Sequence, residues 1–292
     1  AAAIACCAFT FLLGGGPIEM ILAFVAAGIG NLIRTKLIKH HFTLFLNIAV
    51  SISASCFIYA ALLKIAEMAF NVPSIHEAGY ICSMLFIIPG FPFITSGIDL
   101  AKLDLRSGLE RLAYAIIIVM VATMFAWIMA LLLRLQPMDF EDLDLGPVLH
   151  LILRLIMSFF GVFGFSIMFN SPAPMAATAA LIGAIANSLR LELVDLTGMP
   201  APAAAFAGAL TAGLLASFIK ENNGYPRISL TVPSIVIMVP GLYLYRAIYN
   251  FGIMALSDAV SWFASAIMII IALPLGLIFA RILTDKTFRY CT

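Results

Sequence analysis

Residues 112–133 read LAYAIIIVMVATMFAWIMALLL, a run of about 22 residues without a charged side chain. A helix of this length crosses the hydrocarbon core of a bilayer, which is about 30 Å thick. Residues 42–63 and 259–280 form two more such runs. Because lipid offers the backbone no hydrogen-bond partner, a chain with several crossings folds as helices or as a closed barrel. The runs are too long and continuous for barrel strands of about ten alternating residues, and they predict an all-α polytopic membrane protein.

The composition supports the same class. Hydrophobic residues make up 63% of the 292-residue chain and charged residues only 11%, with a net charge of +1. A soluble domain covers its core with more polar residues than this, and a net charge near zero gives no indication of nucleic-acid binding. The five cysteines have no CxxC spacing and most lie in apolar runs, so we interpret them as small core residues: Cys6, Cys7, Cys56, Cys82 and Cys291.

The apolar runs and their breakers predict ten spans in two sets of five. The sequence begins AAAIACCAFT, without the basic flank of a signal peptide, so we expect it to start inside a helix. One longer loop, QPMDFEDLDLGP at 136–147, separates a first five-helix repeat (1–145) from a second (146–292). The predicted spans are 1–13, 18–34, 42–64, 76–98, 109–134, 147–169, 173–190, 200–219, 228–250 and 258–283.

Lysine and arginine predict the orientation, because they gather on the cytoplasmic face. One face collects Arg34, Lys36, Lys39, Lys102, Arg106, Arg111, Lys220, Arg227, Arg281, Lys286 and Arg289; the other collects Lys64, Arg134, Arg154, Arg190 and Arg246. Eleven basic residues against five place both ends of the chain in the cytoplasm and the loop at 136–147 outside. Its acidic residues form a solvated linker or a cation site: Asp139, Glu141, Asp142 and Asp144.

Two similarities between the halves indicate a duplication. AGIGNLIR at 27–34 matches GAIANSLR at 183–190, and IIPGFPF at 87–93 is answered by IMVPGLYLY at 237–245. Because each half has an odd number of spans, five, the second half enters the membrane from the opposite side, and the repeat is inverted. Proline removes a backbone hydrogen bond and glycine weakens a helix, so each Pro-Gly pair predicts a broken span. Inverted repeats with broken helices are typical of secondary transporters, although plain proline kinks are the alternative reading.

Polar residues follow each break. Thr95, Ser96 and Asp99 share one helical face after Pro89-Gly90, and Asn250 takes the position of Asp99 after Pro240-Gly241. An ionisable group in one half and a neutral amide in the other suits a proton-coupled site. Asp99 is alternatively an interfacial carboxylate, about 13 Å of helix beyond the break.

Other polar residues admit structural readings. Asn31 and Asn187 either bind substrate or hold helices together, and Glu19 suits a helix N-terminus. The histidines, including His76, fall near span ends. The chain has no HExxH motif and no glycine-rich phosphate loop, which gives no support to a protease or an ATP motor.

Longer strings resemble the bacterial threonine/serine exporter family. PGFPFITSGIDLAKLDLRSGLERLAYA (89–115) is similar to the first membrane half of that family. GAIANSLRLELVDLTGMPAPAAAFAGAL (183–210) and YPRISLTVPSIVIMVPGLYLYRAIYNFG (225–252) are similar to its second half. The resemblance implies ten membrane helices in the bacterial inner membrane and proton-driven export of small hydroxy amino acids. Some split relatives are associated with dicarboxylate export, and the hydrophilic N-terminal segment usual in the family is absent from this sequence.

Together these observations predict an alternating-access exporter of threonine or serine, without cofactor or enzymatic activity. Its expected partners are a small-molecule substrate, protons and membrane lipid, and homo-oligomerisation stays open. Alternatives are a succinate exporter, a passive channel and a non-transporting membrane scaffold. Amides near the breaks would hold the substrate carboxylate, exposed carbonyls or Asp99 the ammonium, and hydroxyls the side chain. Asp99 is the candidate proton-coupling residue; the candidate substrate-binding residues are Asn31, Pro89, Gly90, Thr95, Ser96, Asn187, Pro240, Gly241, Tyr245 and Asn250.

Overall fold

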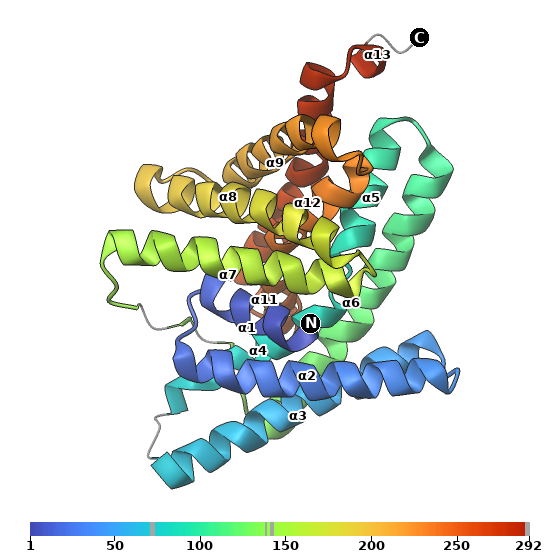
Figure 1. Cartoon of the computed structure of the whole chain (residues 1–292). Coiled ribbons are helices and arrows are strands. Elements are labelled where there is room, and N and C mark those ends of the chain that lie inside the picture. Colours follow the sequence, from blue (N-terminus) through green and yellow to red (C-terminus); the bar gives the residue numbers. More distant parts are fainter. Residues whose placement is uncertain (71–73, 138, 141–142, 290–292) are drawn as a thin grey trace. The chain divides into compact units, whose positions relative to one another are not determined.

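The computed structural model describes residues 1–70, 74–137, 139–140 and 143–289. Every element in these ranges is a helix or a 3₁₀ turn, so the predicted all-α membrane fold is confirmed (Figure 1). The first half contains α1 (Ala2–Leu12), α2 (Pro17–Lys39), α3 (Leu44–Phe70), η1 (Ser74–Ala78), α4 (Gly79–Ser83), η2 (Leu85–Ile87), α5 (Gly90–Ala101) and α6 (Leu105–Leu133). The second contains α7 (Pro147–Met168), α8 (Ala173–Thr197), α9 (Ala201–Asn223), α10 (Arg227–Ile235), η3 (Val236–Met238), α11 (Gly241–Gly252), α12 (Leu256–Thr284) and α13 (Lys286–Arg289).

The helices match the ten predicted segments, with two differences. In the described residues, seven helices are long and apolar enough to span a membrane, and each broken pair adds one more. At 11 residues, α1 is about 16 Å long and too short to cross, so the tenth crossing stays a prediction. The helices α2, α3 and α8 run five to seven residues past their predicted ends. Their charged ends continue the helix because backbone hydrogen bonds persist beyond the apolar run.

Both Pro-Gly pairs interrupt their helices, as predicted. A 3₁₀ turn precedes each pair, η2 before Pro89 and η3 before Pro240. Ile88 (ψ 123°) and Val239 (ψ 132°) then leave the helical region. Proline causes this, because its ring disfavours helical backbone at the residue before it. A new helix begins at each glycine.

The two halves share one order of long helices, and the helices after the breaks also match in length, although α1 has 11 residues and α7 has 22. The helices after the breaks, α5 and α11, have 12 residues each, and α6 and α12 have 29 each. Each starts 151 residues after its counterpart: Gly90 and Gly241, Leu105 and Leu256. The connections match too, since Leu103 (φ 64°) and Met254 (φ 62°) are both left-handed. These matches are what an internal duplication would leave, and the duplication and its inversion across the membrane both stay predictions.

The chain forms two compact units, and each unit contains helices from both halves. Unit 1 consists of 1–88, 116–145 and 241–263; unit 2 consists of 89–115, 146–240 and 264–292. In unit 1, α2 packs against α1, α3 and α4, and α4 contacts α11 (Figure 1). In unit 2, α8 packs against α7, α9 and α10, and α10 contacts α5. Corresponding helices therefore make corresponding contacts in the two units. The exceptions in chain order are α11, which comes from the second half but packs in unit 1, and α5, which comes from the first half but packs in unit 2. The two predicted repeats, 1–145 and 146–292, concern the order of the sequence and stay a prediction, because each compact unit combines segments of both.

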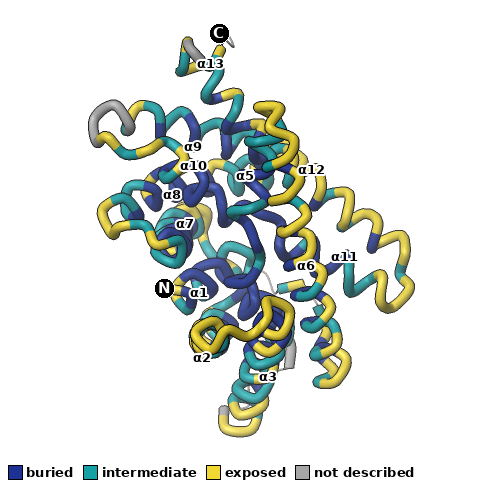
Figure 2. The backbone as a smooth tube through the Cα atoms, turned by 90° about the vertical axis from the view of Figure 1, so that its right-hand side faces the viewer, coloured by how far each residue is buried: buried dark blue, intermediate teal, exposed yellow. Residues whose placement is uncertain are grey.

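Small residues form the helix contacts, and large apolar residues face outward. On α6 the buried alanines are Ala115, Ala122, Ala126 and Ala130, at helical spacing. Small side chains allow helices to approach closely in lipid, where apolar burial gives little driving force. The exposed positions of α2 and α6, yellow in Figure 2, include Ile21, Met120 and Leu132. An exposed apolar surface of this extent suits contact with lipid.

Candidate functional site

The glycine of each break packs against the 3₁₀ turn that precedes the other break. A Cβ added to Gly90, in unit 2, would lie 2.6 Å from Cγ2 of Val236 in η3. A Cβ added to Gly241, in unit 1, would lie 2.9 Å from Cδ2 of Leu85 in η2. Without a side chain, each glycine thus allows its helix to pack closely against the neighbouring 3₁₀ turn of the same unit. The expected binding of substrate by amides near the breaks stays a prediction, and neither of the two cavities described below is lined by Gly90 or Gly241.

A repeated Asn-x-x-Arg motif, at 31–34 and 187–190, also lies beside the breaks. Arg34 donates from Nη1 to the carbonyl of Phe86, 3.2 Å away in η2, and so satisfies an acceptor near the interrupted helix. Its counterpart Arg190 lies beside the matching turn, since Gly208 faces both its Cβ and Sδ of Met238. The motif found by sequence comparison therefore lies next to the break in each unit.

The hydroxyl residues after the first break are buried and bonded to their own helix. The Thr95 hydroxyl donates to the carbonyls of Phe91 (3.0 Å) and Pro92 (3.3 Å), and Ser96 donates to Phe93 (2.8 Å). Thr95 also lines a cavity of about 490 Å³ between α5 and α6. With their protons engaged, these hydroxyls retain oxygen lone pairs for a donor such as an ammonium group.

Asp99 forms an ion pair near the end of α5. Nη1 of Arg111 donates to Oδ2 of Asp99 at 2.7 Å. The aspartate side chain is 17% exposed and the arginine 49%. Its counterpart Asn250 donates to the carbonyl of Arg246 at 2.8 Å. The pair is thus accessible from one side, which fits either an interfacial carboxylate or a proton-exchanging one.

The two repeat asparagines differ in their surroundings. Asn187 is buried in unit 2 and donates from Nδ2 to the Ser158 hydroxyl at 2.9 Å, joining α8 to α7. Its Oδ1 has no hydrogen-bond partner within the described ranges. Asn31 is partly exposed on α2. Asn187 therefore holds two helices together and keeps one acceptor available.

Tyr245 forms a buried pair that sequence reasoning missed. Its hydroxyl lies 2.5 Å from that of Tyr80, with the two rings edge to face in unit 1. The residues are 165 positions apart, on α11 and α4. The 151-residue spacing of the repeat gives no signal for this pair, because Tyr80 aligns with Thr231.

A buried acid–imidazole pair in unit 1 was also missed. Glu19 is 4% exposed, and its Oε1 lies 2.6 Å from Nδ1 of His76. The carbonyl of His76 accepts from the Tyr59 hydroxyl at 2.7 Å, while Oε2 of Glu19 is buried without a partner among the described residues. Glu19 does lie in the first turn of α2, where an acidic residue is expected, but it also contacts a histidine 57 residues away. A paired titratable cluster inside a membrane protein is a candidate for proton handling.

Other ion pairs fit the predicted order of the spans. Arg246 lies 2.8 Å from Asp139 and over the ring of Trp262, and Arg154 pairs with Glu192 at 2.7 Å and with Asp195. Each pair joins two residues that the predicted topology places on one face. Of the acidic loop, Glu141 and Asp142 lie outside the described residues, as does Cys291. Cys6, Cys56 and Cys82 are buried free thiols.

Two family models match the chain, one in each half. The model described as "Putative threonine/serine exporter" matches residues 1–133, and the one described as "Threonine/Serine exporter, ThrE" matches residues 154–283. A stretch of 128 residues is 30% identical to the "Probable succinate transporter subunit YjjP" of Escherichia coli (strain K12). This stretch is 44% of the chain and 48% of that protein, so the chain spans about half the length of this relative. No solved structure gives a significant match.

The two family models cover separate halves of the chain. The helical membrane fold, the two breaks and both matches agree with the resemblance seen in the sequence. The chain belongs to the threonine/serine exporter family, a family of membrane transporters and not of enzymes.

Proposed function

We propose that the protein exports threonine or serine across the bacterial inner membrane, in exchange for protons and with both chain ends in the cytoplasm. The observation that carries this proposal is the paired break. Each half of the sequence contains one span interrupted at Pro-Gly, at matching places. Broken helices at matching places in two repeats are the plan of many secondary transporters, where half-helix ends and freed carbonyls contact the substrate.

Each unit contributes candidate substrate contacts. In unit 2 these are Pro89, Gly90, Thr95, Ser96, Asn187 and Pro240; in unit 1 they are Asn31, Gly241, Tyr245 and Asn250. A hydroxy amino acid needs partners for a carboxylate, an ammonium group and a hydroxyl. Amide groups at the start of α5 and α11 suit the carboxylate, since helix N-termini favour anions. The oxygens of Thr95 and Ser96 suit the ammonium group or the hydroxyl.

Succinate export is the second candidate function. It is favoured by the relative named as a probable succinate transporter subunit, which shares 30% identity over 128 residues. A dicarboxylate would need two cationic or amide partners in place of one. Arg246, which is buried in unit 1, then becomes a candidate partner.

Counterflow in proteoliposomes tests the proposal. Vesicles loaded with unlabelled threonine, serine or succinate should accumulate the same labelled solute from outside, and a pH gradient should drive uphill transport. Protein-free vesicles give the background. A passive channel would show solute flux and conductance without dependence on the pH gradient. The absence of flux for all three solutes, with protein present in the vesicles, would refute the export function.

A further inference from the structure

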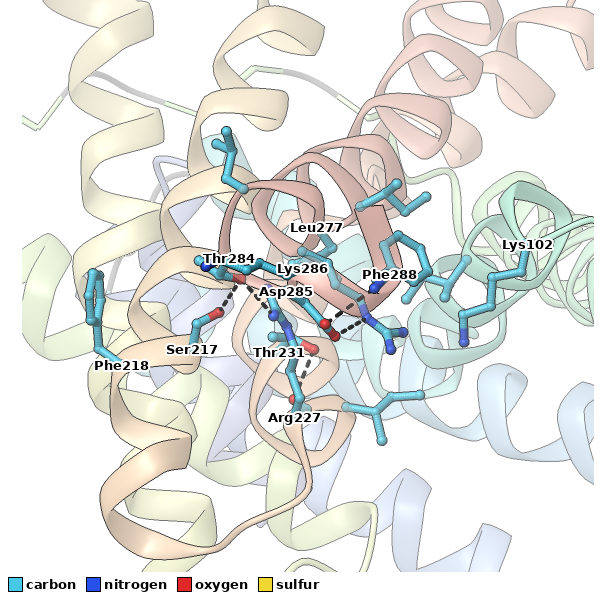
Figure 3. A pocket seen from close by; sticks show the side chains of 15 residues that line it. Lys102, Ser217, Phe218, Arg227, Thr231, Leu277, Thr284, Asp285, Lys286 and Phe288 are labelled. Atoms are coloured by element: carbon cyan, nitrogen blue, oxygen red, sulfur yellow. Dashed lines mark hydrogen bonds and ion pairs between the residues drawn. The ribbon is translucent and has the colours of Figure 1, made fainter. Parts of the chain in front are cut away.

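Unit 2 contains a half-open cavity of about 830 Å³ that none of the candidate residues lines. Helix ends surround it: the end of α5, the end of α9, the start of α10, the end of α12, and α13 (Figure 3). The size lies within the usual range for small-molecule sites, which is about 300–1,000 Å³. The predicted topology places all of these ends on the face with more lysine and arginine.

The lining carries an excess of positive charge. Four cationic side chains line the cavity, Lys102, Arg227, Arg281 and Lys286, against one carboxylate, Asp285. Asp285 lies 3.4 Å from Nε of Arg281 and also accepts from the backbone of Phe288. Lys102 and Lys286 have no side-chain partner in the part of the chain that the structure describes. The described lining residues thus carry a formal excess of three positive charges.

Arg227 is the cation best placed to bind a ligand, because its partners are all neutral. Nη1 donates to Oγ1 of Thr284 at 2.9 Å and Nη2 to the carbonyl of Gly213 at 3.2 Å. The Ser217 hydroxyl lies 3.1 Å from the same Thr284 oxygen, and a dashed line marks this contact in Figure 3. A half-buried guanidinium without a carboxylate in direct contact has lost hydration that two neutral hydrogen bonds replace only in part. An anion in the cavity would restore that interaction.

We propose that this cavity is the docking site for carboxylate solutes at the entry face, and that it holds dicarboxylates more tightly than zwitterionic amino acids. The inference rests on the proposed export function. Arginine recognises carboxylates with a planar pair of donors, and the Ser217 and Thr284 hydroxyls can add neutral hydrogen bonds. A dianion gains from several cations at once. A zwitterion also brings an ammonium group, for which Asp285, already engaged, is the only carboxylate among the described lining residues.

Binding measurements in nanodiscs of zwitterionic lipid test the inference. The purified protein should bind succinate at least about tenfold more tightly than threonine, since one further charge-assisted contact changes affinity by about that factor. Arg227→Gln should weaken succinate binding about tenfold, and Arg227→Lys should restore part of it. Arg106→Gln is the matched control. It removes a cation from the same predicted face, but Arg106 is exposed, pairs with Glu110 and lies outside the cavity.

Further arms separate the sources of the anion and the causes of failure. If anionic lipid, and not succinate, binds in an Arg227-dependent way, the cavity is a headgroup site and the inference is wrong. Equal succinate affinity in Arg227→Gln and Arg106→Gln also overturns it. If Arg227→Gln does not fold, Lys102→Gln with Lys286→Gln replaces it, because both side chains are exposed and should still lower the affinity. If the parent protein transports solute in the counterflow assay but the cavity variants bind succinate as tightly as the parent, only the cavity proposal is refuted. If the parent protein binds succinate but transports none of the solutes, only the export function is refuted.

Discussion

At the scale of single residues, most polar side chains inside the helices already have partners. Thr95, Ser96 and Asn250 bond to their own helices. Asp99 and Glu19 have partners from other elements, Arg111 and His76. Unpaired charge in lipid is costly, so this pairing is expected of any membrane protein. Function therefore has to be tested by changes that preserve shape and remove one property at a time.

Asp99→Asn should separate coupling from transport. We expect this variant to lose uphill, pH-driven export while retaining counterflow, because the amide keeps the shape and cannot exchange a proton. The measurement is accumulation of labelled threonine in proteoliposomes with and without a pH gradient. Arg111→Gln is the matched control, since it breaks the same 2.7 Å ion pair but leaves the carboxylate. Parent-like accumulation by Asp99→Asn would return Asp99 to the role of an interfacial residue.

Glu19→Gln should destabilise unit 1. The substitution keeps the side-chain volume but replaces a charge-assisted contact to His76 with a neutral one, at a cost of about 1 kcal/mol. The free energy of unfolding of the solubilised protein in denaturant measures the loss. Glu110→Gln, at an exposed i,i+4 pair with Arg106, should change it by less than about 0.5 kcal/mol. Equal effects at the two positions would mean that the buried contact contributes no more than the surface pair.

At the scale of elements, the same broken span occurs once in each half of the sequence. Each copy consists of a 3₁₀ turn, an extended residue before proline, and a 12-residue helix that begins at glycine. The proline explains the local break, and the contact made by the glycine explains why no larger residue stands there. The copies are unequal: the nearest side-chain atom is 2.6 Å from an added Cβ at Gly90 and 2.9 Å at Gly241.

Alanine at Gly90 should therefore reduce counterflow more than alanine at Gly241, and leucine at either position should abolish it. The added carbon at Gly90 meets Val236, a β-branched residue that adjusts less easily than Leu85. Initial counterflow rates, normalised to protein in the membrane, provide the comparison. Gly146→Ala is the control, because its added Cβ has no neighbour within 4 Å. Full activity in both leucine variants would show that the breaks are ordinary kinks.

At the scale of the whole molecule, the two halves of the sequence are not the two units of the structure. Unit 1 includes α11 from the second half, and unit 2 includes α5 from the first. Each exchanged helix begins immediately after a break. A change at either break therefore affects a helix that packs in the other half's unit.

The predicted topology provides a test at this scale. Reporter fusions after Leu135 and after Thr292 should report outside and inside respectively, because five spans lie before the first position and ten before the second. Paired reporters that are active on opposite sides of the membrane provide the measurement. The same side for both fusions would be incompatible with ten crossings and with an inverted repeat.

Local composition was sufficient to predict the helices and the breaks. Uncharged runs such as 112–133 are long enough to span lipid, and Pro-Gly interrupts a helix whatever surrounds it, so both features follow from nearby residues alone. The Asn-x-x-Arg repeat was equally visible, since a duplication leaves its pattern in the sequence. The ends of α2, α3 and α8 were not, because a helix continues past the apolar run that predicts it.

Only the tertiary structure could show which distant residues meet. Glu19 and His76, Tyr80 and Tyr245, and the cations around Arg227 are brought together by packing between elements 57 to 165 residues apart or at separate helix ends. No periodicity within one segment encodes such contacts. The exchange of α5 and α11 is of the same kind: it depends on which surface each helix buries, and that is decided by the free energy of the whole packed unit.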